Sequence, residues 1–193
     1  RHVLAWDRAT WLAHRDEDAA TAAGGEFAST FEALVARRSR REPIAYIRGT
    51  QEFYGRAFTV ARGVLIPRPE TEMIIDEALR AAAEPGAAAP LRIADIGTGS
   101  GILAVTLALE LPAAAVTATD VSPAALAMAR RNADAYHVGS RVTLVEASYL
   151  DGVDGPFDLV VANPPYVRSV DASTLAPEVR DFEPAEALFG GAD

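Results

Sequence analysis

The stretch Leu91-Arg92-Ile93-Ala94-Asp95-Ile96-Gly97-Thr98-Gly99-Ser100-Gly101 passes from a short apolar run into evenly spaced glycines. Residues 91–96 have the pattern of a buried strand, and residues 100–111 have the pattern of a helix. Glycines between a strand and a helix permit a tight turn and let a ligand approach the backbone, while the helix N-terminus offers free N–H groups. The stretch therefore predicts a strand–loop–helix unit with a ligand-binding loop.

The same alternation of strand and helix continues along the chain. Strand patterns recur at residues 115–119, 141–146 and 157–162. Ser122-Pro123 supplies an N-cap and a first-turn proline for a helix that reaches about residue 137. Short apolar strands that alternate with helices indicate parallel pairing with right-handed crossovers. We expect an α/β fold with a doubly wound, mainly parallel sheet.

The chain before this sheet has a different pattern. Residues 2–15 and 27–40 carry apolar side chains at helical intervals, and residues 16–25 have the composition of a loop. Residues 45–65 alternate in hydrophobicity and contain glycines, which indicates a hairpin. Residues 70–83 predict a helix, with a buried face formed by Met73, Ile74, Ala78 and Leu79.

The second of the two N-terminal helices ends in a cluster of arginines, Arg37, Arg38, Arg40 and Arg41. Basic residues are favoured at a helix C-terminus, and charge runs are usually solvated. A solvent-facing helix end is the preferred interpretation, and a binding patch is the alternative.

Composition limits the classes of function. No cysteine is present and the three histidines are scattered, so we expect no metal site. The net charge of −9 argues against stable nucleic-acid binding, because such binders normally present a basic face to phosphates. No apolar run is long enough to span a bilayer and no signal-peptide pattern opens the chain, so we expect no membrane association and a cytoplasmic location.

Candidate ligand-binding residues follow all four strand patterns. The glycine loop comprises Asp95, Gly97, Thr98, Gly99, Ser100 and Gly101. It suits a dinucleotide pyrophosphate, a mononucleotide or the amino-acid end of S-adenosylmethionine. The even glycine spacing departs from G-x-G-x-x-G, and the chain has no lysine for a Walker motif, which disfavours dehydrogenases and NTPases.

Two further candidates for binding the same ligand follow the second and third strand patterns. Asp120 can accept both ribose hydroxyls of an adenosine, and Ser122 already serves as the N-cap that Asp120 would otherwise provide. Tyr149 either flanks the adenine or is an ordinary surface tyrosine. Ligands of open α/β sheets bind beyond the carboxyl ends of the strands, so we expect these residues to meet at one edge.

The fourth strand pattern is followed by Asn163-Pro164-Pro165-Tyr166. Each proline fixes its own φ and lacks an N–H, so the turn is rigid and rich in hydrogen-bond acceptors. The Asn163 side-chain oxygen and the Pro164 carbonyl can grip the two hydrogens of a planar NH2 group, with Tyr166 packed on its face and Pro165 fixing the turn. The alternative is that the prolines merely end an edge strand.

In combination, these motifs resemble class I S-adenosylmethionine-dependent methyltransferases that act on amide or amino nitrogen. Three further stretches resemble the HemK/PrmC family within that class. They are Arg41-Glu42-Pro43-Ile44-Ala45-Tyr46-Ile47-Arg48-Gly49 with Glu52-Phe53-Tyr54-Gly55, Val64-Leu65-Ile66-Pro67-Arg68-Pro69-Glu70-Thr71-Glu72, and Glu183-Pro184 with Ala187-Leu188. The resemblance covers residues 37–193 and is loose over the N-terminal helices.

The resemblance implies a function and a domain organisation. The family methylates the N5 nitrogen of the glutamine in the Gly-Gly-Gln motif of class I peptide chain release factors, with S-adenosyl-L-methionine as cofactor and S-adenosyl-L-homocysteine as product. The cofactor would contact the glycine loop, Asp120, Tyr149 and Asn163. We expect an incomplete N-terminal docking domain (1–42), a β-hairpin linker (43–66) and a methyltransferase domain (67–193) in a monomeric enzyme.

The fold of this family usually has seven strands, and four are evident here, so we expect three more strands beyond residue 193. Three other functions remain open: methylation of a glutamine in a ribosomal protein, methylation of adenine N6 in nucleic acid, and nucleotide binding without catalysis. The Pro69-Glu70-Thr71-Glu72 run favours the release-factor enzyme over the ribosomal one.

Overall fold

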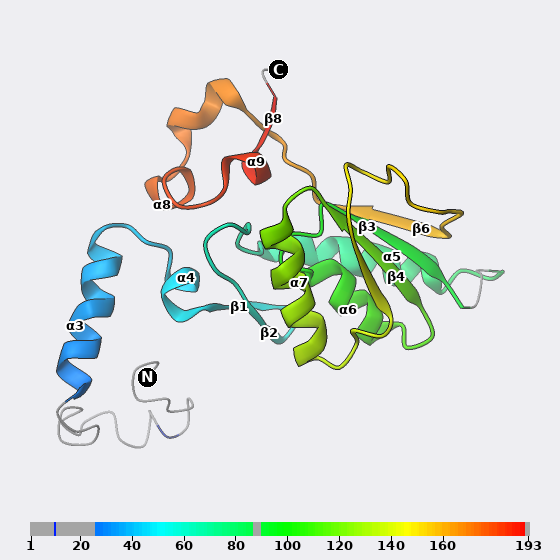
Figure 1. Cartoon of the computed structure of the whole chain (residues 1–193), viewed down its shortest axis with the longest axis horizontal. Helices are drawn as coiled ribbons and strands as arrows, with labels where there is room; N and C mark the ends of the chain where they lie inside the picture. The colour runs from blue at the N-terminus through cyan, green and yellow to red at the C-terminus, as the bar shows by residue number, and fades with distance from the viewer. Residues whose placement is uncertain (1–9, 11–25, 87–89, 192–193) are drawn as a thin grey trace.

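The computed structural model describes residue 10, residues 26–86 and residues 90–191 (Figure 1). Its centre is a parallel sheet with the strand order β5-β4-β3-β6, formed by β3 (Arg92–Ile96), β4 (Ala115–Asp120), β5 (Val142–Glu146) and β6 (Leu159–Ala162). β3 is an inner strand, since Ile93 pairs with Val116 on one side and with Leu159 on the other. The predicted α/β fold with a parallel sheet is confirmed.

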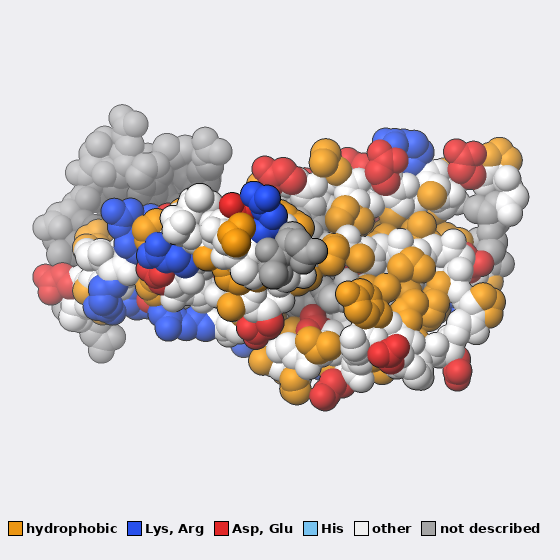
Figure 2. All heavy atoms as spheres, turned by 90° about the horizontal axis from the view of Figure 1, so that it is seen from above, with side chains coloured by type: hydrophobic (Ala, Val, Ile, Leu, Met, Phe, Trp, Pro, Cys, Tyr) orange, Lys and Arg blue, Asp and Glu red, His pale blue; other side chains and the backbone are white. Residues whose placement is uncertain are grey.

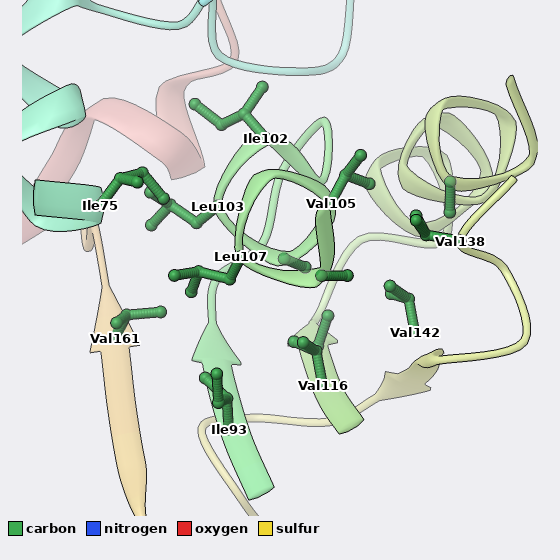
Figure 3. Close-up of a cluster of buried hydrophobic side chains, with 14 of the residues drawn as sticks. Ile75, Ile93, Ile102, Leu103, Val105, Leu107, Val116, Val138, Val142 and Val161 are labelled. Atoms are coloured by element: carbon green, nitrogen blue, oxygen red, sulfur yellow. The ribbon is translucent and has the colours of Figure 1, made fainter. Parts of the chain in front are cut away.

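Three helices pack against this sheet: α5 (Glu72–Ala82), α6 (Ile102–Glu110) and α7 (Pro123–Ala135). Figure 3 shows Leu103 and Leu107 of α6 on the side of the sheet that Ile93 and Val116 face. The strands β3, β4 and β5 lie side by side in chain order. Because crossovers between parallel strands are right-handed as a rule, this order puts α6 and α7 on the same face of the sheet. β6 lies on the other side of β3, which makes the carboxyl end of β3 the switch point where such sheets bind ligands.

The main hydrophobic core lies between these helices and the sheet. Its largest fully buried side chains come from the hairpin, α5, β3, α6, β4 and the start of β5, and each contributes roughly 2 kcal/mol by burial; they include Phe53, Phe58, Ile75, Ile93, Val105, Leu107, Val116 and Val142. The hairpin therefore packs as part of this core.

The segment before the sheet forms α3 (Glu26–Ser39), α4 (Ile44–Arg48) and a hairpin of β1 (Thr50–Phe53) and β2 (Arg56–Thr59). The predicted helix over residues 27–40 and the hairpin are confirmed. The predicted helix over residues 2–15 and the loop over 16–25 lie outside the described residues. The alternation over residues 45–65 predicts extended chain from residue 45, but Ile44–Arg48 forms a helical turn between Pro43 and the left-handed Gly49.

The solvated interpretation of the arginine cluster is wrong for two of its members. Arg37 donates through Nε and Nη2 to the buried Glu42 carboxylate at 2.9 and 2.6 Å. Arg38 donates to the Glu42 carbonyl oxygen at 3.1 Å and pairs with Glu178 at 3.4 Å. Arg40 and Arg41 remain exposed. Figure 2 shows most of the visible arginine side chains gathered over the end of the molecule that carries α3.

The buried face of α5 also differs from the prediction. Met73 is 64% exposed, whereas Ile75 and Ala78 are buried. The chain enters α5 through a 3-10 turn, η1 (Pro69–Thr71). Successive residues of a helix are about 100° apart, so Met73 lies about 200° from Ile75 and faces away from the core.

After Asn163-Pro164-Pro165-Tyr166 the chain leaves the central sheet and forms a small separate sheet. It forms β7 (Val167–Arg168), η2 (Ser169–Thr174), α8 (Pro177–Arg180), α9 (Ala185–Leu188) and β8 (Phe189–Gly191), and β8 pairs with β7 in parallel. In Figure 1 this excursion lies beyond the carboxyl ends of the sheet strands. Within the described ranges, no helix has the length and apolarity that a membrane span requires.

Candidate functional site

A cavity of about 290 Å³ lies at the carboxyl edge of the sheet. The loops after β3, β4, β5 and β6 all contribute to it, as the sequence predicted for this edge. Among the predicted site residues, the cavity is lined by Gly97, Thr98, Gly99, Ser100, Asp120, Tyr149, Asn163, Pro164 and Pro165. Asp95, Gly101 and Tyr166 are not among the lining residues.

The glycine loop is fixed to the neighbouring strand by two hydrogen bonds. The Thr98 N–H donates to the Thr119 carbonyl oxygen at 2.9 Å, and the Gly99 N–H donates to Asp120 Oδ2 at 2.8 Å. Gly97, Gly99 and Gly101 all have positive φ, at 70°, 55° and 80°. This conformation is costly for other residues, which explains the even glycine spacing.

Gly101 has a second reason to be glycine. A Cβ atom at this position would lie 2.8 Å from the Ala129 Cβ of α7, which is closer than such contacts allow. Gly101 therefore permits the close approach of α6 and α7 that supports the loop from below. Asn132 of α7 adds to this support, since its Nδ2 donates to the Ser100 carbonyl oxygen at 2.8 Å.

Asp95 lies beneath the loop and is fully buried. Its Oδ2 accepts from Thr98 Oγ1 at 2.6 Å and from the Ala104 N–H at 3.1 Å, while its Oδ1 has no protein partner within the described residues. Burial raises the pKa of the Asp95 carboxyl to about 6, although the bonds from Thr98 and Ala104 act in the opposite direction. The geometry gives Asp95 the role of shaping the loop from below.

The raised pKa of Asp95 gives a testable dependence of stability on pH. The folded state binds the Asp95 proton more tightly than the unfolded chain does. The contribution of Asp95 is therefore fully present below its ordinary pKa of 3.8 and is lost as the pH rises through about 6. We expect the unfolding free energy of the wild type to fall relative to that of D95N by roughly 2–3 kcal/mol between about pH 4 and about pH 7.5.

Chemical denaturation of both proteins across this pH range measures the difference. Groups other than Asp95 cancel in the comparison because both proteins contain them. A difference in unfolding free energy that is independent of pH would contradict the raised pKa.

Asp120 connects three parts of the site. Its Oδ2 accepts from Gly99 as described, its Oδ1 accepts from the Ser122 N–H at 2.9 Å, and its carbonyl oxygen accepts from the Ala147 N–H at 3.1 Å. The predicted N-cap of α7 is confirmed, since Ser122 Oγ accepts from the Ala125 N–H at 3.3 Å. Each Asp120 oxygen keeps a further lone pair for a ligand.

Tyr149 lines the cavity with an exposed side chain and a left-handed backbone at φ 51°. Its carbonyl oxygen accepts from Thr119 Oγ1 at 2.7 Å, which ties the loop after β5 to the end of β4. An aromatic side chain at the rim of a cavity can stack on a planar ligand group.

On the other side of β3, Asn163, Pro164 and Pro165 line the same cavity. Asn163 is half-buried, and its Nδ2 lies 3.5 Å from Thr71 Oγ1 as a donor, which leaves its Oδ1 free to accept a bond from a ligand. Tyr166 is 75% exposed and lies outside the cavity lining. The residues expected to bind a nucleoside (the glycine loop, Asp120 and Tyr149) and the residues expected to bind an amide (Asn163 to Pro165) therefore line one cavity.

Residue-by-residue reasoning missed the outer wall of the cavity, which we define as residues 63–67 and 184–187. Glu183 joins its two parts: Oε2 accepts from the Ile66 N–H at 3.0 Å and Oε1 pairs with Arg68 at 2.6 Å. The Glu183 side chain is 1% exposed. Most residues of this wall belong to two of the stretches quoted above, Val64–Glu72 and Glu183-Pro184 with Ala187-Leu188, but nothing in their local pattern shows that they meet.

The charge of the cavity lining is one-sided. Among the described lining residues, the charged side chains are those of Asp120 and Glu186, and both are acidic. A phosphate-bearing ligand would face carboxylates without a compensating cation. A ligand with ribose hydroxyls and a positively charged group fits this lining better.

Two family models match the chain. Residues 75–179 match the methyltransferase small domain, and residues 1–49 match the PrmC N-terminal domain. A solved S-adenosylmethionine-dependent methyltransferase from Agrobacterium tumefaciens has a TM-score of 0.50 at 17% identity, covering 62% of this chain and 40% of that one. At this identity the likeness shows the fold alone.

The chain is also similar to curated proteins named release factor glutamine methyltransferase. The protein of Geobacter sulfurreducens is 54% identical over 161 residues, which are 83% of this chain and 54% of that protein. The protein of Chlorobaculum tepidum is 50% identical over 165 residues, with 82% and 56% covered. That of Bordetella pertussis is 43% identical over 189 residues, with 97% and 66% covered.

The chain spans about half the length of the first two of these relatives. The methyltransferase small domain model by itself covers more than half of the chain, and it spans the glycine loop, Asp120 and Asn163-Pro164-Pro165-Tyr166. The chain therefore belongs to the methyltransferase small domain family, with an N-terminal part that matches the PrmC N-terminal domain.

Proposed function

We propose that the protein transfers a methyl group from S-adenosyl-L-methionine to the N5 amide nitrogen of the glutamine in the Gly-Gly-Gln motif of class I peptide chain release factors. One observation carries the proposal: Asn163 and Pro164 line the same cavity as the glycine loop and Asp120. The similarity to named release factor glutamine methyltransferases supports the choice of a protein glutamine over other planar amino groups.

The cavity residues fit S-adenosylmethionine by their chemistry. Asp120 offers lone pairs to the ribose hydroxyls, Tyr149 offers a face to the adenine, and the glycine loop offers close backbone approach to the amino-acid end. The lining carries two carboxylates and no cationic side chain among its described residues, in keeping with a ligand that has no phosphate. When bound, the cofactor supplies an electrophilic methyl group and leaves as S-adenosyl-L-homocysteine.

A glutamine amide nitrogen is a weak nucleophile because its lone pair is delocalised into the carbonyl group. In the proposed site, Asn163 Oδ1 and the Pro164 carbonyl oxygen accept the two amide hydrogens. This orients the nitrogen's out-of-plane face and stabilises the positive charge that develops on it. The exposed Tyr166 is available to pack on the amide plane, and Pro165 keeps the turn rigid. The extra proton leaves after the transfer, so no strong base is required.

The protein substrate also needs a docking surface. We assign docking to the N-terminal domain (1–42), connection to the hairpin linker (43–66) and catalysis to residues 67–193. The exposed Arg40 and Arg41 are available to a partner, whereas Arg37 and Arg38 are engaged within the chain. We further propose a monomeric cytoplasmic enzyme without stable nucleic-acid binding, in keeping with the net charge of −9.

The test is methyl transfer from labelled cofactor to purified substrates with the full-length protein. We expect label on a release factor and none on the same factor with its Gly-Gly-Gln glutamine replaced by alanine. Equal labelling of both factors would refute the assigned target. Label on ribosomal protein or on nucleic acid in place of the release factor would identify the corresponding alternative substrate.

A further inference from the structure

Glu186 is one of the two charged residues among those described that line the cavity, and the proposed function gives it no role. We propose that Glu186 is a specificity residue whose carboxylate favours the positively charged sulfonium cofactor over the neutral thioether product. The proposal rests on the proposed function, since it assumes that the cavity binds S-adenosyl ligands. Glu186 would bind the cation through charge, whereas Asp120 would bind the ribose through hydrogen bonds.

The position of Glu186 is fixed although its side chain is exposed. It lies on the short α9, between Glu183 and Leu188, which are both buried. Glu183 ties the start of this segment to Ile66 and Arg68, as described above. Beyond α9, Phe189 of β8 pairs with Val167 of β7. A segment held at both ends keeps the Glu186 backbone in one place.

The same segment lies on the side of the cavity that is formed by Asn163, Pro164 and Pro165. Gly190 approaches the Asn-Pro-Pro turn so closely that a Cβ atom there would be 2.6 Å from the Pro165 carbonyl oxygen. Asp120 and Tyr149, in contrast, follow β4 and β5 on the other side of β3. If Asp120 takes the ribose, the reacting sulfur must lie toward Asn163 to deliver the methyl group. Glu186 therefore lies on the side of the cavity where the sulfonium end of the ligand would be.

The electrostatic consequence is selective. Methyl transfer removes the positive charge from the sulfur, so a carboxylate nearby attracts the cofactor and loses that attraction for the product. A pair of unit charges about 4 Å apart in a water-like medium gives a preference of about fivefold, which salt reduces. Glu186 would thereby help fresh cofactor to replace product.

The experiment compares two ligands by calorimetric titration of the full-length protein. S-adenosylhomocysteine is neutral at the reacting position, and sinefungin carries a protonated amine there. In E186Q we expect the ratio of the two dissociation constants to shift by about fivefold against sinefungin, with the value for S-adenosylhomocysteine changing less than about twofold. Raising the salt from about 0.05 M to about 0.5 M should reduce the wild-type preference toward that of E186Q.

E77Q is the matched control, because it makes the same substitution at an exposed glutamate that pairs with Arg80 on α5 and does not line the cavity. We expect this variant to bind both ligands as the wild type does, with their ratio unchanged. An unchanged ratio in E186Q, with both ligands bound by the wild type, would refute the role of Glu186 and leave the proposed function standing. Failure of the wild type to bind either ligand would overturn the proposed function and the inference together.

Discussion

Replacing Asn163 by alanine should lower the rate of methyl transfer by about 100- to 1,000-fold, with cofactor affinity within about twofold of the wild type. Asn163 is the side chain of the cavity that can accept an amide hydrogen beside the Pro164 carbonyl oxygen. Its Nδ2 already faces Thr71 Oγ1 at 3.5 Å, so its Oδ1 is the atom left to the substrate. Removing this oxygen takes away an acceptor that strengthens its bond as charge develops on the nitrogen.

Single-turnover transfer to a release factor measures the rate, and titration with S-adenosylhomocysteine measures cofactor affinity. Glu77→Ala is the control variant, because Glu77 pairs with Arg80 on the exposed surface of α5 and does not line the cavity. It should change neither quantity. Undiminished transfer by N163A would refute the proposed grip on the amide. An equal loss of rate and of cofactor affinity would show that Asn163 acts chiefly on the cofactor.

The sheet could be read from the sequence because each of its strands is short, apolar and bounded by turn residues. Residues 91–96 predict β3 (Arg92–Ile96), and residues 141–146 predict β5 (Val142–Glu146) to within one residue. Parallel sheets are usually covered on both faces, so their strands tend to be near-continuous apolar runs. The N-cap at Ser122 is equally local, since the cap and the N–H that it accepts are three residues apart.

The features that could not be predicted from the sequence depend on contacts between residues far apart in the chain. Arg38 pairs with Glu178, 140 residues away, and Glu183 accepts from Ile66, 117 residues away. No periodicity relates such positions. The helical turn of α4 and the exposed Met73 show the same limit at short range, because neighbouring packing decides which of two similar faces is buried.

One part of the candidate site could also be predicted from the sequence, and another part could not. The carboxyl ends of parallel strands must meet at one edge, so Asp120 and Asn163 could be assigned to one cavity from topology alone. The outer wall follows no such rule, and Glu186 reaches the cavity because Glu183 holds its segment there. Asp95 shows that a motif does not fix the role of each of its residues. Its place in the motif predicted contact with a ligand, whereas in the structure it is fully buried and supports the loop from beneath.

Replacing Asp120 by alanine should weaken binding of S-adenosylhomocysteine by about 100-fold, the equivalent of two hydrogen bonds to a charged acceptor. Two effects combine in this loss. Asp120 Oδ2 accepts from Gly99 at 2.8 Å, so its removal frees the glycine loop, and the remaining lone pairs are lost to the ribose. A 2′-deoxyribose analogue separates the two effects. The wild type should bind this analogue about tenfold more weakly than S-adenosylhomocysteine. D120A should bind the analogue and S-adenosylhomocysteine with the same affinity.

Asp158 provides a matched control, because it makes the same kind of contact at the opposite edge of the sheet. Its Oδ2 accepts from the Arg92 N–H at 2.7 Å, at the amino end of β3, and it does not line the cavity. D158A should lower the unfolding free energy by about 1–2 kcal/mol and leave ligand affinity unchanged. If D158A weakened binding as much as D120A, the loss would reflect general destabilisation of the sheet. If D120A lost nothing while the deoxy analogue still bound weakly, the ribose would be held by another group, and Asp120 would only support the loop.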